Sequence, residues 1–485
     1  MRLWEIAEEL DVEIAVGFKD VHITGITYDS RMVKKGDIFV AIEGFNADGH
    51  DFIRDAIKMG ASAVVVQRHI PTDSKIAQVE VKDSRQALAK ISSKFYNNPS
   101  SKFNLIGVTG TNGKTSTTYI IESIFQAREK NIGVVGTIGC LVNGMFIETK
   151  NTTPESLELQ QLFNEILESN VENCVIEVSS HSLEMSRVAY SDFDIGILTN
   201  ITKDHLDYHK TMENYYNAKK KLFFMTNKYN IINIDDEYGR RLYNELSIIK
   251  TPLLTYGIDS ESNVYATDIC LRATGVSFKL HTPKESIDIN MKIPGLFTVY
   301  NGLAAASSAY AYDIDIEYIK MGLDQVRGIK GRFEVIPTNK DFTVIIDFAH
   351  TADALDKVLS VIDQFAEGRK IVVFGAGGDR DRTKRAPMGE VAGRHCDLCI
   401  VTSDNPRTEE PKKIINDIIE GVKKVKGNYI DIVDRREAIE YAIKNSRPKD
   451  IILLAGKGHE THTIIGDRVV AFDESEIVKE ALKLL

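Results

Sequence analysis

The sequence predicts an α/β protein with three domains: a small N-terminal α/β domain, a central domain with a doubly wound, mainly parallel sheet, and a C-terminal Rossmann-like α/β domain. Short apolar runs alternate with helical patterns, which is typical of parallel sheets covered by helices. A glycine-rich turn joins one of these runs to the helix that follows it. The alternation starts again after residue 330, and 485 residues are enough for about three domains of about 150 residues each. We place the domains at 1–97, 98–330 and 331–485.

The first 97 residues predict a small mixed unit. An apolar run covers 37–43, a helical stretch covers 51–59 and ends at Gly60, and the run 63–66 predicts a buried strand. The segment 97–101, Asn-Asn-Pro-Ser-Ser, is rich in turn-forming residues and closes the unit.

The central and C-terminal domains repeat a strand–turn–helix pattern. The run 105–108 predicts a buried strand, and 115–128 predicts the helix after it. Further strands are expected at 133–136, 174–178, 195–198 and 231–234 in the central domain, and at 342–346, 370–374, 398–401 and 451–454 in the C-terminal domain. Ligands bind at the carboxyl ends of parallel strands, so we expect the sites there and in clefts between domains.

Composition narrows the possible functions. The net charge is −10, whereas a general nucleic-acid binder needs a basic face. No apolar stretch approaches the roughly 18 residues of a membrane span, and the early Glu5, Glu8 and Glu9 argue against a signal peptide. Five cysteines are a sparse and odd set, which is typical of a reduced compartment. We therefore expect a cytoplasmic protein with no membrane span and no nucleic-acid partner.

Residues 109–115, Thr-Gly-Thr-Asn-Gly-Lys-Thr, follow a predicted strand and open a predicted helix. Backbone N–H groups in such a turn cradle phosphate oxygens, and the helix N-terminus adds partial positive charge. We expect Lys114 to reach the β- and γ-phosphates of a nucleotide and the Thr115 hydroxyl to ligate Mg²⁺. The strict pattern has glycine at the position of Val108, so this is a variant phosphate loop. The alternative is a glycine-rich turn that happens to contain lysine.

Three further segments of the central domain carry candidate metal ligands. Glu177 ends a buried strand, where it could hold a metal or be a polar strand-end residue. His205 and His209 would share one helix face if their segment is helical, although Asp and His also cap helices. Of Lys219–Lys221, at most one faces a given site, because consecutive helix positions point about 100° apart. The alternative for this run is a solvated basic patch.

Three strand ends of the C-terminal domain carry charged side chains. Arg380 stands where a dinucleotide fingerprint would need glycine, so that interpretation of the turn before it fails. Arg407 follows Pro406 and could pair with a carboxylate in a bidentate manner. Glu460 follows a third strand. Together they suggest a zwitterionic ligand, and the alternative is that each belongs to a surface loop.

These motifs resemble those of the Mur ligases of peptidoglycan synthesis, over nearly the whole chain. The resemblance rests on residues 28–31, 48–50, 109–115, 151–153, 177–181, 204–209, 301, 331–334 and 347–351. Within the family, Asp-Asn-Pro-Arg at 404–407 resembles the members that add meso-2,6-diaminopimelate to UDP-N-acetylmuramoyl-L-alanyl-D-glutamate. Lysine-adding relatives usually differ at the arginine position. The sequence departs from the family at Phe348, where Tyr is common, and at Met185, where some relatives carry a polar side chain.

The resemblance implies roles for individual residues. The UDP-substrate would be bound by Ser30, Asn151, Thr152, Thr153, Ser179 and Arg187. ATP would be bound by Gly110, Thr111, Asn112, Gly113, Lys114, Thr115, Ser116, Asn301, Arg332, Asp347 and His350. Mg²⁺ would be held by Thr115, Glu177, His205 and a carbamylated Lys219, and the catalytic group would be Lys114, Glu177, His205 and Lys219. The amino-acid site would comprise Arg380, Asp404, Asn405, Pro406, Arg407, Gly456 and Glu460.

The activity implied by the resemblance is ATP-dependent amide ligation. ATP would phosphorylate the free carboxylate of the UDP-linked dipeptide, and the diaminopimelate amine would attack the acyl phosphate. We therefore expect small-molecule substrates, Mg²⁺ as a cofactor, and a monomer. The alternatives are the same reaction with L-lysine, a folylpolyglutamate synthetase, and a nucleotide-dependent switch or scaffold that performs no ligation. A folylpolyglutamate synthetase would lack the separate uridine-nucleotide domain.

Overall fold

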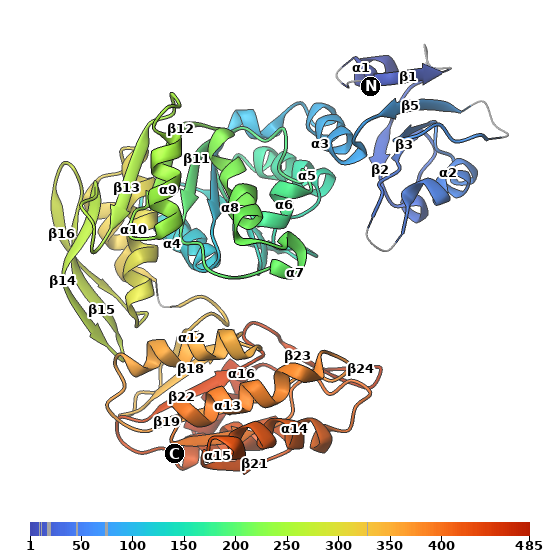
Figure 1. The fold of residues 1–485 in the computed structure, drawn as a ribbon. Coiled ribbons are helices and arrows are strands. Elements are labelled where there is room, and N and C mark those ends of the chain that lie inside the picture. The colour runs from blue at the N-terminus through green and yellow to red at the C-terminus, as the bar shows by residue number, and fades with distance from the viewer. Residues whose placement is uncertain (9, 11, 17–20, 45–46, 73–75, 327) are drawn as a thin grey trace. The chain divides into compact units, whose positions relative to one another are not determined.

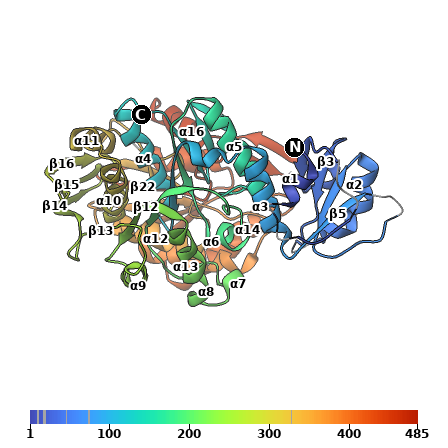
Figure 2. The same ribbon diagram turned by 90° about the horizontal axis from the view of Figure 1, so that it is seen from above.

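The computed structural model describes residues 1–8, 10, 12–16, 21–44, 47–72, 76–326 and 328–485. The chain forms two compact units, which are Met1–Asn263 with Ala304–Ile314, and Val264–Leu303 with Asp315–Leu485. Both units combine helices with mainly parallel sheets (Figure 1; Figure 2), which confirms the predicted α/β class. The domain boundaries expected at 97 and 330 stay predictions.

The N-terminal sheet of the first unit has the strand order β1-β5-β4-β3-β2. Its strands are β1 (Val12–Val16), β2 (Gly25–Thr27), β3 (Asp37–Val40), β4 (Ala63–Val66) and β5 (Ala77–Val81), and its helices are α1 (Leu3–Ala7), α2 (Ile53–Met59) and α3 (Ser84–Phe95). Neighbouring strands are parallel except for the pair β1–β5. Strands β3 and β4 are buried on both faces, which explains why each reads as a continuous apolar run.

The larger sheet of the first unit has the order β13-β12-β11-β6-β10-β7-β8-β9. Its strands are β6 (Asn104–Thr109), β7 (Ile132–Gly136), β8 (Gly139–Val142), β9 (Met145–Ile147), β10 (Asn173–Glu177), β11 (Phe193–Leu198), β12 (Thr226–Asn233) and β13 (Leu253–Gly257). Its helices are α4 (Lys114–Ala127), α5 (Ser156–Glu168), α6 (Ser180–Glu184), α7 (Leu206–His209), α8 (Met212–Lys220) and α9 (Glu237–Leu246). The strands from β13 to β7 are parallel, so β6 and β10 open side by side at the same edge.

The second unit contains an antiparallel group of strands and a mainly parallel sheet. The antiparallel group is β14 (Val264–Arg272), β15 (Gly275–His281) and β16 (Ser286–Met291), and helix α11 (Ile316–Gln325) contacts β16. The sheet has the order β17-β18-β22-β19-β20-β21, in which only β17 is antiparallel to its neighbour. Its strands are β17 (Glu334–Ile336), β18 (Thr343–Asp347), β19 (Lys370–Phe374), β20 (Leu398–Val401), β21 (Tyr429–Asp431) and β22 (Ile451–Ala455).

Helices cover both faces of this sheet. They are α12 (Ala352–Asp363), α13 (Arg385–His395), α14 (Pro411–Lys424), α15 (Arg435–Lys444) and α16 (Glu474–Leu482). Helices α15 and α16 share one apolar core with Val344, Val373 and Leu454 of the sheet. Helix α13 contacts both α12 and α14. This doubly wound arrangement leaves the loops after β19, β20 and β22 at one edge of the sheet, where the candidate site residues lie.

The remaining elements are a hairpin, a shared helix and short 3-10 turns. The hairpin is β23 (His462–Ile465) with β24 (Arg468–Ala471), and helix α10 (Leu296–Ala311) contributes residues to both units. The 3-10 turns are η1 (Ser30–Met32), η2 (Gly49–Phe52), η3 (Pro99–Lys102), η4 (Lys221–Phe224) and η5 (Arg382–Lys384). No helix in the described part of the chain is long and apolar enough to cross a membrane.

Each strand predicted from an apolar run overlaps an observed strand. The antiparallel strands β14–β16 and the hairpin β23–β24 have no counterpart among the predicted elements. Many of their side chains are exposed, and every residue of β24 is, so they lack a continuous apolar run. The apolar runs therefore reveal most of the buried parallel strands, although not β5 or β13, and they miss these half-exposed antiparallel strands.

Candidate active site

The loop between β6 and α4 has the geometry of a phosphate loop. Gly110 to Gly113 form the turn, and Lys114, Thr115 and Ser116 form the first turn of α4. Gly110 has φ of +151°, and a Cβ there would lie 1.8 Å from Thr199 Oγ1, so only glycine fits. Lys114 Nζ donates to the carbonyls of Gly110 at 3.0 Å and Thr111 at 2.9 Å. The lysine side chain therefore folds back over the loop in which a phosphate would bind.

Glu177 lies at the end of β10, directly beside this loop. Its buried carboxylate accepts hydrogen bonds from Thr115 Oγ1 at 3.0 Å, from the Thr137 backbone N–H at 2.8 Å and from Thr137 Oγ1 at 3.1 Å. A Cβ at Gly136 would lie 2.2 Å from Glu177 Oε1, so this glycine makes room for the carboxylate. The carboxylate and the Thr115 hydroxyl are hard oxygen donors of the kind that suits Mg²⁺.

Lys219, in α8, reaches the same loop from the other side. Its side chain is buried, and its Nζ donates to the Gly110 carbonyl at 2.7 Å. Burial lowers the pKa of Lys219 well below its usual range, and the charge of Lys114 lowers it further. By contrast, Lys220 pairs with Glu245 at 2.6 Å and Lys221 with Glu184 at 2.9 Å. The three lysines therefore point to three different partners.

The two predicted histidines do not share a helix face. His205 has φ of +51° and caps α7, which begins only at Leu206, and its side chain is exposed. His209 is buried and its Nε2 lies 2.9 Å from Ser180 Oγ. Because His205 precedes the helix that contains His209, the two histidines do not pair on one helix face, although both rings lie near that of Tyr215. Within the described ranges, no group of three or more His, Cys, Asp and Glu is arranged to hold a metal.

His181 joins these residues although the sequence motifs did not single it out. Its ring centroid lies 4.9 Å from that of His205 and 5.5 Å from that of His209. Burial, with His205 and His209 close by, lowers the pKa of His181 to about 4. The only sequence signal for His181 was its position in the motif segment 177–181.

The residues expected to bind the UDP-linked dipeptide surround Glu177. Thr153 Oγ1 donates to the Glu177 carbonyl at 2.7 Å and accepts from the Ser179 N–H at 3.1 Å. Arg187 Nη1 donates to the Thr153 carbonyl at 3.1 Å. Thr152 Oγ1 lies 3.1 Å from Thr137 Oγ1, and Asn151 is exposed. Thr152, Thr153, Ser179 and Arg187 therefore lie together at the end of β10.

Ser30 lies in the wall of a cavity of about 820 Å³ in the first unit. Arg85 and Glu155 line the same cavity, and their side chains approach to 3.6 Å. Tyr28 also lines it, and its hydroxyl donates to Glu158 Oε1 at 2.6 Å. The cavity is large enough for a small-molecule ligand.

In the second unit, Arg332, Asp347 and His350 gather around Phe348. The guanidinium of Arg332 lies 5.0 Å from the Phe348 ring centroid, and His350 Nδ1 lies 2.9 Å from the Phe348 carbonyl. Asp347 accepts from the N–H groups of Phe333 and Ala349, both at 2.8 Å, and burial raises its pKa. Asn301 is buried in α10.

The loop after β20 carries Asp404 to Arg407. Asn405 Nδ2 donates to Glu460 Oε2 at 2.9 Å, and Arg407 Nη1 donates to the Gly378 carbonyl at 2.8 Å. Gly456 has φ of +115°, and a Cβ there would lie 2.9 Å from Asp404 Oδ2. The structure thus brings together Asp404, Asn405, Pro406, Arg407, Gly456 and Glu460, with Arg380 exposed on the adjoining loop after β19.

A buried lysine also belongs to this cluster and is absent from the predicted set. Lys457 is fully buried, and its Nζ donates to Asn405 Oδ1 at 3.2 Å and to the His462 carbonyl at 2.9 Å. Burial lowers its pKa. Its place between Gly456 and Gly458 was the available sequence signal.

Models of the Mur ligase family match three stretches of the chain. "Mur ligase family, catalytic domain" matches residues 22–96, "Mur ligase middle domain" matches 108–309, and "Mur ligase, glutamate ligase domain" matches 331–458.

Whole-chain relatives point to the same family. A protein of Caldanaerobacter subterraneus subsp. tengcongensis and one of Clostridioides difficile are 49% and 47% identical over 482 residues, covering 99% of this chain and of each relative. Both are named UDP-N-acetylmuramoyl-L-alanyl-D-glutamate–2,6-diaminopimelate ligase. A solved structure of a ligase with that name has 30% identity and a TM-score of 0.74, and covers 99% of this chain and 98% of its own. A folylpolyglutamate synthase of Mycobacterium tuberculosis shares the fold at 16% identity and a TM-score of 0.60, but covers 76% of this chain and 92% of its own.

Proposed function

This chain belongs to the Mur ligase family of ATP-dependent amide ligases, and on that premise we propose that it joins meso-2,6-diaminopimelate to UDP-N-acetylmuramoyl-L-alanyl-D-glutamate. The observation that carries the proposal is the convergence of Lys114, Glu177 and Lys219 on one phosphate loop. The names of the relatives supply the two substrates.

The chemistry requires two anions to approach one another. An oxygen of the dipeptide's free carboxylate attacks the γ-phosphorus of ATP, and ADP leaves with the electron pair of the broken bond. The diaminopimelate amine then attacks the acyl carbon, loses a proton, and phosphate leaves. Lys114 stabilises the charge on the transferring phosphoryl group, because a fixed cation in a partly buried loop acts there without reorganisation.

We propose that Thr115 and Glu177 hold Mg²⁺, with His205 and a carbamylated Lys219 as further ligands. When bound, the ion would neutralise phosphate charge. Only a neutral amine adds to CO₂, forming a carbamate and releasing a proton. The buried position and lowered pKa of Lys219 support this modification, because they favour the neutral amine.

We assign amino-acid selection to Arg407, with Asn405 and Arg380 beside it. Diaminopimelate carries a second carboxylate that lysine lacks, and an arginine pairs with a carboxylate in a bidentate manner. A site built for such a pair rejects an analogue without the polar group by about 10⁴-fold. The UDP-linked part of the other substrate is assigned to the cavity that Ser30 lines.

One assay tests the proposal against its alternatives. The protein is incubated with ATP and the UDP-linked dipeptide, and meso-diaminopimelate, L-lysine and L-ornithine are offered separately, with phosphate release and product mass as readouts. We expect phosphate release and product only with diaminopimelate. Product with lysine would identify a lysine-adding ligase, and phosphate release independent of all three amino acids would identify a nucleotide-dependent switch. We further propose that the enzyme acts as a monomer in the cytoplasm on small-molecule substrates.

A further inference from the structure

Two loops carry the arginines assigned to the amino-acid site. Residues 375–381 follow β19 and contain Arg380, and residues 402–410 follow β20 and contain Arg407. The loops touch along their backbones, because a Cβ on Gly378 would lie only 1.9 Å from the Pro406 carbonyl oxygen. The position of Arg407 therefore depends on what holds the two loops together.

Arg385, the first residue of α13, lies behind this junction and is fully buried. Its Nη2 donates to Glu409 Oε1 at 2.7 Å and its Nη1 donates to Glu409 Oε2 at 3.0 Å, which makes a bidentate pair. The same guanidinium donates to Asp417 Oδ2 at 2.9 Å and to the Gly377 carbonyl at 3.3 Å. One side chain thus joins the β19 loop, the β20 loop and helix α14.

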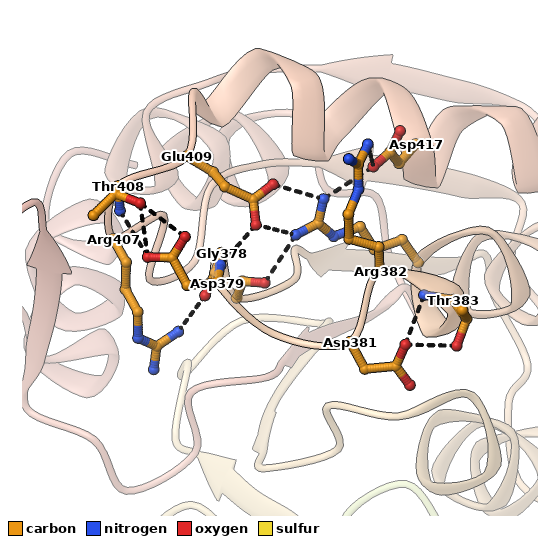
Figure 3. Close-up of polar contacts among 11 residues, drawn as sticks. Gly378, Asp379, Asp381, Arg382, Thr383, Arg407, Thr408, Glu409 and Asp417 are labelled. Carbon is orange, nitrogen blue, oxygen red and sulfur yellow. Dashed lines mark hydrogen bonds and ion pairs between the residues drawn. The ribbon is translucent and has the colours of Figure 1, made fainter.

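Glu409 passes this connection on to the β19 loop (Figure 3). Its Oε1 also accepts from the Asp379 N–H at 2.6 Å. The Asp379 carboxylate in turn accepts from the Thr408 N–H at 3.1 Å and from Thr408 Oγ1 at 2.8 Å. Arg385 holds the pKa of Glu409 down at about 2, so this contact stays charged at neutral pH.

Arg407 itself is held in an uncommon conformation. Its φ is +50°, in the left-handed region that few residues other than glycine, asparagine and aspartate adopt. Its backbone N–H donates to the Ile464 carbonyl at 3.1 Å and its carbonyl accepts from the Gly466 N–H at 2.7 Å. A strained conformation of this kind persists only where its surroundings fix it. The hairpin fixes one side of the loop, and the Arg385–Glu409 pair fixes the other.

We propose that Arg385 is a positioning residue that sets amino-acid selectivity by fixing Arg407 against the β19 loop. The inference rests on the proposed function. Arg385 is enclosed by protein groups, so it acts through Arg407 and not by contact with the substrate. Loss of its charge would leave Glu409 and Asp417 without their shared cation, and Glu409 of the β20 loop would no longer be joined through Arg385 to the Gly377 carbonyl of the β19 loop. The Arg407 guanidinium would then no longer be positioned to pair with the second carboxylate of diaminopimelate.

The test measures selectivity and not only activity. For Arg385→Lys, Arg385→Met and Glu409→Gln, kcat and KM are determined for diaminopimelate and for lysine, together with KM for ATP. We expect KM for diaminopimelate to rise and its kcat/KM advantage over lysine to fall by about 10-fold or more, as for a small displacement of a positioned group. KM for ATP should stay within about twofold, and Arg385→Lys should recover part of the selectivity, since it keeps the charge but not the bidentate pair.

Arg382→Met is the matched control. Arg382 also donates to Asp417, at 3.2 Å. Its side chain is exposed, however, and the hydrogen bonds to the Glu409 side chain come from Arg385 and the Asp379 N–H instead. We expect wild-type selectivity for this variant. Thermal unfolding is followed in parallel, and Glu409→Gln supplies the readout if Arg385→Met does not fold.

The possible outcomes distinguish a failure of the proposed function from a failure of the role proposed for Arg385. Wild-type protein that makes no product with diaminopimelate overturns the proposed function and this inference with it. A selective wild type whose Glu409→Gln and Arg385→Lys variants lose activity equally for both amino acids, with unchanged selectivity, overturns the inference alone. A fall in selectivity confined to the Arg385 and Glu409 variants supports it.

Discussion

A single carbonyl oxygen, that of Gly110, accepts hydrogen bonds from two lysines of different elements. Lys114 Nζ lies 3.0 Å from it and Lys219 Nζ lies 2.7 Å from it. Two ammonium groups on one acceptor repel each other, and the lowered pKa of buried Lys219 relieves this repulsion. At the scale of single residues, burial beside Lys114 therefore favours the neutral form of Lys219.

Lys114→Ala removes the cation nearest the proposed γ-phosphate. We expect kcat to fall by about 10²-fold or more, roughly 3 kcal/mol, as for other lost charge stabilisation at a transition state. Steady-state phosphate release with all three substrates measures the effect. Turnover close to that of the wild type would contradict the phosphate-loop assignment.

Lys219→Ala should abolish most activity, because it removes the group that we propose becomes a carbamate. A small added carboxylate, such as formate or acetate, should restore part of the rate by standing in for the carbamate. Lys220→Ala and Lys221→Ala are the controls, since these lysines pair with Glu245 and Glu184 and not with the Gly110 carbonyl. Equal losses in all three variants would mean that the run is only a basic patch.

Arg407→Ala should lower kcat/KM for diaminopimelate by about 10²-fold or more, on the scale of a lost charged pair. KM values for ATP and for the UDP-linked substrate should change little, because the groups assigned to those ligands lie on other loops. Initial rates with each substrate varied in turn check both statements. An unchanged preference for diaminopimelate over lysine would place the selectivity elsewhere.

At the scale of elements, helices α13 and α14 approach closely through glycine. A Cβ at Gly421 would lie 1.8 Å from the Ala386 carbonyl oxygen, and a Cβ at Gly389 would lie 2.1 Å from the Ile418 carbonyl oxygen. Both contacts are with backbone, which has little freedom to yield. The same pair of helices carries Arg385 and Asp417, so their spacing bears on the loop that holds Arg407.

Gly421→Ala has two opposing effects on the free energy of unfolding. Helix propensity alone favours alanine by about 1 kcal/mol, whereas overpacking a tight contact costs about 1–3 kcal/mol. Because the clash is with backbone, we expect net destabilisation, measured as a lower midpoint in urea unfolding. The neighbouring Glu420→Ala, at an exposed position of the same helix, should leave the midpoint almost unchanged. A more stable Gly421→Ala protein would contradict the close packing of α13 on α14.

The sequence predicts elements better than it predicts contacts. Strands such as β6 and β22 are buried on both faces, so an apolar run is enough to find them. Strand β24 is exposed throughout and gives no such signal. The role proposed for Arg385 was hidden for a different reason, since it depends on Glu409 of the β20 loop and Asp417 of α14, which only the tertiary fold brings to it. The left-handed backbone conformation of His205 could not be predicted either, because hydrophobic periodicity carries no information about φ at a single residue.

At the scale of the whole molecule, an acidic chain is proposed to bind anionic substrates. With a net charge of −10, attraction over long distances does not favour a nucleotide. Binding must then depend on local groups such as Lys114 and Arg407, whose fields act at short range and are screened by salt over about 8–10 Å.

Stability should depend on pH through Glu122, a carboxyl inside helix α4. Burial raises its pKa from 4.5 to about 7, although Gln126 Nε2 donates to it at 2.8 Å. A raised carboxyl pKa means that the folded state holds the proton more tightly. The contribution is therefore fully present below about pH 4.5 and is lost as the pH rises through about 7.

Glu122→Gln should remove this dependence. We expect the variant to be more stable than the wild type at pH 8, by about 1–3 kcal/mol, and nearly equal to it at pH 4.5. Thermal or urea unfolding at both pH values measures the difference. The control is Glu129→Gln, at an exposed position just after the same helix, which should shift neither value. Equal stabilisation by Glu122→Gln at both pH values would exclude the ionisation as its cause.

The left-handed backbone at Arg407 also limits which mutations can redirect the enzyme to another amino acid. A replacement at this position must tolerate φ near +50° before its side chain can matter. Glycine, asparagine and aspartate do so at little cost, whereas valine and isoleucine do not. The hairpin bonds at Ile464 and Gly466 use backbone atoms only, so they survive any substitution there except proline, which has no N–H to donate. Single substitutions at position 407 that change the amino-acid specificity are therefore limited to a few residue types. The limit comes from the backbone geometry and not from the shape of the pocket.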